Sequence, residues 1–217
     1  MKKFLALAMT FALAAVLVAC GSDNTAKSED TDKDIDTSQL IIDKDNKSIS
    51  MYAEVNGQFF TESTRHGVVY QDGGNKDVTL FRAYPSQFDF YDALEEIGAK
   101  PGDNLSLDDL GGTVDGSKLD VTVSWDGSDG EIPFAEVIKT SSGEPYKVDA
   151  RFGGMLEAAK EYDTGCIFCL ESCPAGISSN AAYPFGVVDE GIEQFMGNGD
   201  ILPKDGSQVK ITFTLAD

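Results

Sequence analysis

The chain has 217 residues, of which 41% are hydrophobic and 25% are charged, a composition typical of one or two globular domains. Aspartate and glutamate total 37 against 17 lysine and arginine residues, so the formal net charge is −20. So acidic a surface repels phosphate groups and anionic lipid headgroups, which argues against nucleic-acid binding and against electrostatic docking to membranes.

The first predicted element is a leader peptide. Two lysines precede an apolar run from Phe4 to Ala19, which is typical of a secretory signal and short for a membrane-spanning helix. Residues 17–20, Leu-Val-Ala-Cys, resemble a bacterial lipobox, and this implies cleavage after residue 19 and lipid attachment to Cys20. The alternative is an ordinary signal peptide with Cys20 as a free thiol. We therefore expect an extracytoplasmic protein anchored to a bacterial membrane through Cys20.

The next segment is predicted to be a tether. Residues 20–47 are rich in charge and contain no aromatic residue, so they can bury too little apolar surface to become ordered. We expect residues 20–47 to be a disordered acidic tether and residues 48–217 to form a single domain.

The first half of this domain contains strand candidates followed by a helix. The strand candidates, separated by Asn-Gly and Asp-Gly turn sequences, are Ile49–Phe60, Gly67–Gln71 and Asp77–Tyr84. Ser86 and Asp89 then resemble a capping box, and apolar residues at positions 90, 94 and 97 recur at helical spacing. Gly98 and Pro101 predict the end of that helix.

The second half begins with a predicted hairpin, in which Asp115-Gly116 joins residues 112–114 to a strand at 119–125. Residues 119–125 and 209–215 alternate between apolar and polar residues, which predicts half-buried strands of antiparallel sheets. A weaker strand candidate covers residues 132–139, and a short helix covers residues 155–162. The predicted fold class is α+β, a single domain of mainly antiparallel sheet with two or three short inserted helices and a sandwich as one arrangement.

Three of the four cysteines lie together, in a C-x2-C-x3-C-P sequence formed by Cys166, Cys169, Cys173 and Pro174. The bacterial ferredoxin pattern has a further cysteine before these three, where this chain has Asp163. An iron–sulfur cluster with three cysteines and an oxygen or nitrogen donor is one interpretation, with Asp163 or His66 as fourth ligand. Zinc held by the three cysteines and His66, the single histidine, is the alternative.

Two other interpretations of the cysteines involve no metal. An exported protein meets an oxidising compartment, which favours a disulfide between two of the three cysteines and leaves one free thiol. If the segment is helical, positions 166, 169 and 173 share one face and are small buried hydrophobic residues. Because gaps of three and four residues return a helix or a tight loop to one side, we expect the three cysteines to converge.

Several segments resemble the YdjY-like domain family. The most specific are the cysteine block from Thr164 to Ile177 and the block Ile97–Leu105; Thr64–Val69, Arg151–Gly154 and Ile201–Pro203 are also similar. The family is described as ferredoxin-type and iron–sulfur-binding on the strength of its cysteines. The resemblance therefore implies a shared fold and a shared cysteine site over most of residues 50–215, and it implies no particular reaction.

These observations favour a surface-anchored metal or redox protein, with Cys166, Cys169 and Cys173 as ligands and an envelope redox partner. The alternatives are a non-catalytic binding lipoprotein in which the cysteines form a structural disulfide, and an extracytoplasmic thiol enzyme. No catalytic residue is predicted, because nothing indicates a nucleophile poised on His66 and the many carboxylates single out no acid–base pair.

Overall fold

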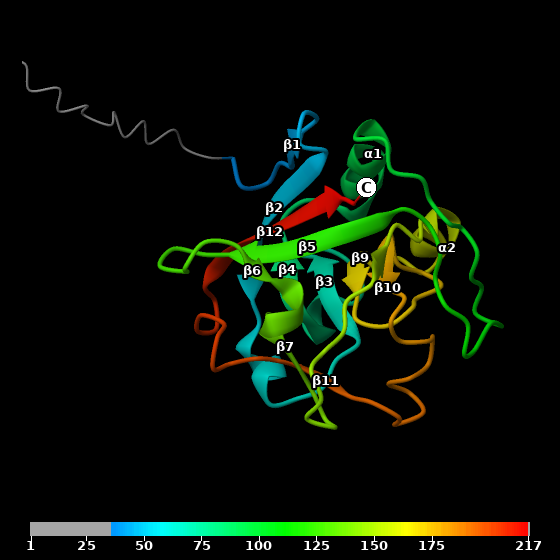
Figure 1. Ribbon diagram of the computed structural model, residues 1–217. Helices are drawn as coiled ribbons and strands as arrows, with labels where there is room; N and C mark the ends of the chain where they lie inside the picture. The colour runs from blue at the N-terminus through cyan, green and yellow to red at the C-terminus, as the bar shows by residue number, and fades with distance from the viewer. Residues whose placement is uncertain (1–35, 217) are drawn as a thin grey trace, which may run out of the picture. The chain divides into compact units, whose positions relative to one another are not determined.

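The computed structural model describes residues 36–216, in which eight strands close into a β-barrel (Figure 1). Cys20 and the predicted leader lie outside the described residues, as does the tether up to residue 35. The strands follow one another around the barrel in the order β2 (Ser48–Val55), β12 (Gln208–Leu215), β5 (Lys118–Ser124), β8 (Ala150–Arg151), β10 (Ser178–Asn180), β9 (Cys166–Cys169), β3 (His66–Tyr70) and β4 (Thr79–Ala83).

The barrel closes because β4 pairs with β3 on one side and with β2 on the other. The β3–β4 and β9–β10 pairs are parallel and the other pairs around the ring are antiparallel, so the prediction of mainly antiparallel sheet is confirmed. A sandwich, the arrangement that the sequence suggested, is wrong. Two packed sheets would leave unpaired edge strands, whereas the β2–β4 ladder removes the edge.

Four short strands outside the ring extend the sheet or form a second one. β1 (Ile41–Asp43) pairs with β2, so ordered structure begins before Ser48, inside the segment assigned to the tether. β6 (Ile132–Pro133) pairs with β5. The remaining two, β7 (Ile138–Thr140) and β11 (Phe195–Gly197), form a separate two-stranded sheet.

Two α-helices are present in the described residues, α1 (Gln87–Glu96) and α2 (Leu156–Glu161), as the sequence predicted. The Ser86 side chain caps α1 by accepting a hydrogen bond from the Asp89 N–H, and Phe90 packs on Phe213 with ring centroids 4.8 Å apart. Three short 3-10 helices complete the set: η1 (Gly57–Phe60), η2 (Lys76–Val78) and η3 (Phe134–Val137). Within residues 36–216, no helix has the length and apolarity needed to cross a bilayer.

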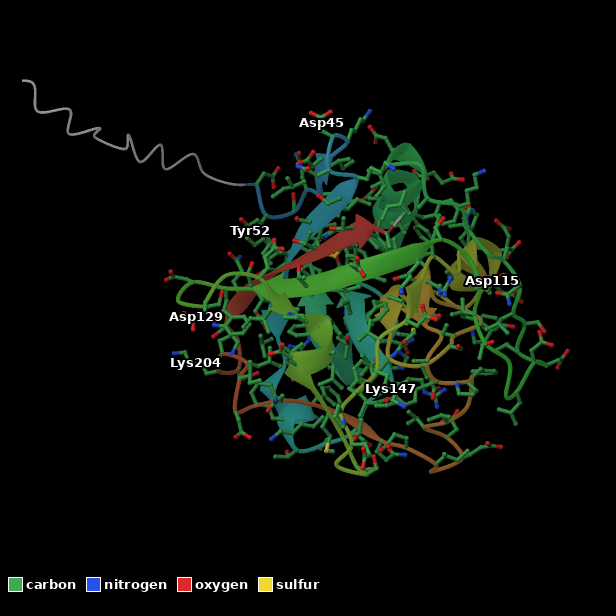
Figure 2. All side chains as sticks on the ribbon, in the orientation of Figure 1. Asp45, Tyr52, Asp115, Asp129, Lys147 and Lys204 are labelled. Carbon is green, nitrogen blue, oxygen red and sulfur yellow. The ribbon has the colours of Figure 1, made fainter. Side chains whose placement is uncertain are left out.

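The apolar residues of the alternating segments form the barrel core. Val121 and Val123 from β5 and Ile211 and Phe213 from β12 are buried in one cluster. Figure 2 shows the labelled Asp45, Asp115, Asp129, Lys147 and Lys204 on the outer loops.

Three predicted elements differ from the structure. The strand predicted at residues 49–60 ends at Val55, and Gly57–Phe60 form η1 instead. Residues 132–139 are not one strand, because η3 separates β6 from β7 and Pro133 has no N–H to continue a ladder. The hairpin at Asp115-Gly116 does not form. Residues 112–114 instead bond to distant loops, for example through the Val114 N–H, which donates to Ser172 Oγ at 3.1 Å, and Gly116 forms a bridge with Pro101.

Glu193 joins β11 to the loop after β7 and gives the fold a dependence on pH. Burial alone would raise the pKa of Glu193, but hydrogen bonds from Ser141, Ser142 and the Gln194 N–H outweigh it and lower the pKa to about 2. Because the folded pKa lies below the unfolded value, this stabilisation is complete above the ordinary glutamate pKa and is lost as the pH falls through about 2.

Glu193→Gln is therefore expected to lower the free energy of unfolding by about 1 kcal/mol at pH 7, a value reduced from the full shift to allow for solvent screening. The difference from the unsubstituted protein should shrink towards zero near pH 2. Urea titrations at several pH values measure it, with the exposed Glu190 as the matched Glu→Gln control. A loss that does not change with pH would contradict this account.

Candidate metal centre

The candidate site is built on the antiparallel pair of β3 and β9. Its register runs His66–Cys169, Val68–Phe168 and Val69–Cys166, with two shifts that mark β-bulges. In a regular strand, residues three apart point to opposite faces, but the bulges place Cys166 and Cys169 on one face. They lie there with Val69 in a cluster separate from the barrel core, into which Ile167 and Phe168 pack.

His66, Cys166 and Cys169 form a group that can hold a metal ion. Their ligand atoms all lie within 4.8 Å of one another, and His66 Nδ1 is 3.4 Å from Cys166 Sγ. Both cysteines are fully buried, whereas His66 is half-buried. The His66 backbone is fixed on both sides, since its N–H donates to Thr64 Oγ1 and its carbonyl accepts from Thr79 Oγ1.

Cys173 lies beside this group, so the structure brings all three cysteines together. The link is Gly176, where an added Cβ would lie 3.1 Å from Cys169 Sγ and 3.4 Å from Cys173 Sγ. The Cys173 N–H donates to Ser179 Oγ at 3.2 Å, and the side chain of Cys173 is half-buried. Cys173 and His66 are therefore the two candidate ligands that reach solvent.

Asp163, the other predicted fourth ligand, is not brought to this group. The Asp163 side chain is exposed, and its backbone carbonyl accepts a hydrogen bond from the Gly74 N–H at 2.8 Å. Asp163 therefore serves to hold a neighbouring loop, and of the two predicted fourth ligands only His66 lies with the cysteines.

Two loops cover the cysteines. The loop at residues 71–76 is held against the chain before β9, where the Asn75 N–H donates to the Thr164 carbonyl. Its glycine Gly73 packs so tightly that an added Cβ would lie 2.4 Å from the Gly165 Cα. The second loop, residues 170–177, is tied down by Thr164 Oγ1, which donates to the Ala175 carbonyl at 2.9 Å.

The electrostatics of the group favour one thiolate. The hydrogen bond with the Cys169 thiol holds the pKa of Cys166 well below its usual range, and His66 and Asn75 lower it further against the opposing effect of burial. The hydrogen bonds with Cys166 and Cys173, together with burial, raise the pKa of Cys169. A cation at this position would relieve the cost of ionising the second and third thiols.

Sequence reasoning missed three residues around the site. Asn75 Nδ2 donates to Cys166 Sγ at 3.5 Å, and Gly176 lies against the other two sulfurs. Glu171 is buried two residues after Cys169, and burial raises the pKa of its carboxyl group while the Val188 N–H and Arg65 lower it. Glu171 and Gly176 lie within the cysteine block, so their position in the sequence could have indicated that they border the site. No feature of the sequence around Asn75 indicates that it contacts Cys166.

The interpretation of the cysteines as one face of a helix is wrong. Cys166–Cys169 is strand β9, and the convergence of the sulfurs comes from the bulges and from the returning loop. In the structure all three are free thiols.

The fold and the site together define an acidic β-barrel domain with a cysteine–histidine group that can hold a metal ion. The chain belongs to the YdjY domain family, whose domain matches residues 40–214. It is 41% identical over 218 residues to the uncharacterized protein YdjY of Escherichia coli (strain K12), covering 100% of this chain and 96% of that protein. No solved structure matches. These matches confirm the predicted resemblance to the YdjY-like domain family.

Proposed function

We propose that this protein is a lipoprotein of the cell envelope whose barrel holds a metal centre for electron transfer. The ligands are the sulfur atoms of Cys166, Cys169 and Cys173 and the imidazole of His66. The observation that carries the proposal is the convergence of these thiols and this imidazole in a largely buried group. Thiolate and imidazole donors suit iron and zinc, and bound iron would supply one-electron redox chemistry.

The donor separations bear on the form of the centre. Bonds of about 2.3 Å to sulfur and about 2.0 Å to nitrogen place tetrahedral donor atoms roughly 3.5 Å apart. The 3.4 Å between Cys166 Sγ and His66 Nδ1 agrees with this, which favours a single ion. The C-x2-C-x3-C-P spacing favours an iron–sulfur cluster instead. A closed zinc site is the second candidate function, favoured by the same 3.4 Å separation.

The surrounding residues suit either centre. Asn75 donates to the Cys166 sulfur, as groups around metal ligands commonly do, and the two covering loops keep water away from Cys166 and Cys169. Cys173 and His66 remain half-buried, so the site is open to a partner at these two residues. This partial exposure supports a role in electron transfer over a purely structural one.

Metal and acid-labile sulfide analysis, with a thiol count on protein prepared without oxygen, tests the proposal. Iron near or above one equivalent supports it, and sulfide in proportion to the iron identifies a cluster. One equivalent of zinc with no iron supports the second candidate. Metal-free protein with one disulfide and one free thiol would overturn both.

The lipid anchor is tested separately. Cys20→Ala is expected to move the protein from the membrane to the soluble fraction, because stable anchoring needs more than one acyl chain or a spanning helix. Fractionation with a labelled fatty acid measures this. Membrane association that persists in the variant, with no label on the unsubstituted protein, would contradict lipidation.

A further inference from the structure

We propose that the groove between α2 and residues 103–108 is the docking site for a cationic protein that presents an apolar side chain. Its role as the docking site of a redox partner rests on the proposed function. The groove has a volume of about 370 Å³ and is separate from the cysteine–histidine group.

The walls of the groove combine apolar side chains from three segments of the chain. They are Leu105, Leu107, Met155, Tyr162 and Pro174. Leu107 is 52% exposed, Tyr162 is 50% exposed and Leu105 is half-buried, whereas Met155 and Pro174 are buried beneath them in the wall. Exposed apolar residues gathered in a groove with a polar rim mark protein interaction sites.

The rim of the groove is acidic, and this identifies the charge of the occupant. Asp103, Asp108, Glu157 and Glu161 line it, and no basic residue does. Lys160 pairs with Glu157 at 3.1 Å, whereas the other three carboxylates have no ion pair within residues 36–216. An anionic lipid surface would be repelled by this rim, so the complementary occupant is a protein surface rich in lysine or arginine.

The groove adjoins the part of the site that reaches solvent. Pro174 forms part of its wall and directly follows Cys173, the half-buried cysteine of the group. The chain that follows α2 is held to the segment that follows Cys173, since Thr164 Oγ1 donates a hydrogen bond to the Ala175 carbonyl at 2.9 Å. A protein seated in the groove would therefore contact the segment that carries Cys173, close to the centre with which it would exchange electrons.

The test measures binding of a basic c-type cytochrome to the full chain by calorimetry at about 0.15 M ionic strength, where the Debye length is about 8 Å. The double variant Asp108→Lys/Glu161→Lys is expected to weaken binding at least about tenfold. The control is Asp45→Lys/Asp129→Lys, which makes the same change in net charge at exposed positions elsewhere on the domain (Figure 2). We expect the control to weaken binding less than about threefold, because charges farther away than a Debye length are screened.

A second pair of variants separates the apolar contact from charge. Leu107→Ser is expected to weaken binding severalfold at unchanged charge, whereas Ile201→Ser, at an exposed isoleucine away from the groove, should not. Equal losses of binding affinity in the groove double variant and in its control double variant would overturn the proposal, because they would show that the cytochrome responds only to net charge. Failure of the unsubstituted protein to bind would overturn it too.

Metal analysis of the same preparations keeps this test apart from the proposed function. Metal-loaded protein that does not bind the cytochrome refutes the docking site and leaves the metal centre standing. Metal-free protein that binds through the groove refutes the metal centre and leaves the docking site standing.

Discussion

Cys169→Ser is expected to abolish metal binding and to lower the free energy of unfolding by about 3 kcal/mol or more. Cys169 is fully buried at the end of β9, and its sulfur lies between Cys166 and Cys173. A serine hydroxyl is a poor metal ligand. Once the metal is lost, two ionisable thiols and the serine hydroxyl remain in an apolar setting. Metal analysis and urea titration of the variant measure both effects.

Serine at Cys166 and at Cys173 completes the experiment. Under the metal-centre proposal all three variants lose the metal, with the smallest loss of stability at the half-buried Cys173. Under the disulfide alternative one of the three substitutions is silent, because a free thiol holds nothing together. Three silent substitutions would show that the cysteines act only as buried apolar side chains.

Gly73→Ala is expected to lower the free energy of unfolding by about 2 kcal/mol and metal affinity about tenfold. The added Cβ would lie 2.4 Å from the Gly165 Cα, and backbone at that position cannot move aside as a flexible side chain can. The 71–76 loop must shift, which withdraws Asn75 from the Cys166 sulfur. Competition with a chelator measures the change in affinity.

Gly143→Ala is the control for this prediction. Gly143 also resists substitution, because its φ of +78° disfavours a side chain, but no atom lies within 4 Å of its added Cβ. We expect a loss of about 1 kcal/mol there with unchanged metal affinity. Gly73→Ala protein that binds metal as tightly as the Gly143→Ala protein would contradict the role assigned to the loop.

Local patterns in the sequence were sufficient to predict some of the elements. Strict alternation at 119–125 and 209–215 predicted β5 and β12, since alternate side chains of a half-buried strand meet core and solvent. The capping residues at 86 and 89 and the apolar spacing after them predicted α1. The cysteine spacing predicted that the sulfurs of Cys166, Cys169 and Cys173 converge. His66 was one of the two residues predicted as a fourth ligand.

Only the tertiary structure decided how these elements come together. The β2–β4 ladder closes the barrel, and β3 pairs His66 with Cys169 of β9. In both cases the local sequence around each residue does not predict its partner. The bulges that turn Cys166 and Cys169 to one face arise only once β3 and β9 pair. That His66 and not Asp163 lies beside the cysteines follows from that pairing, because it depends on distances across strands and not on spacing along the chain.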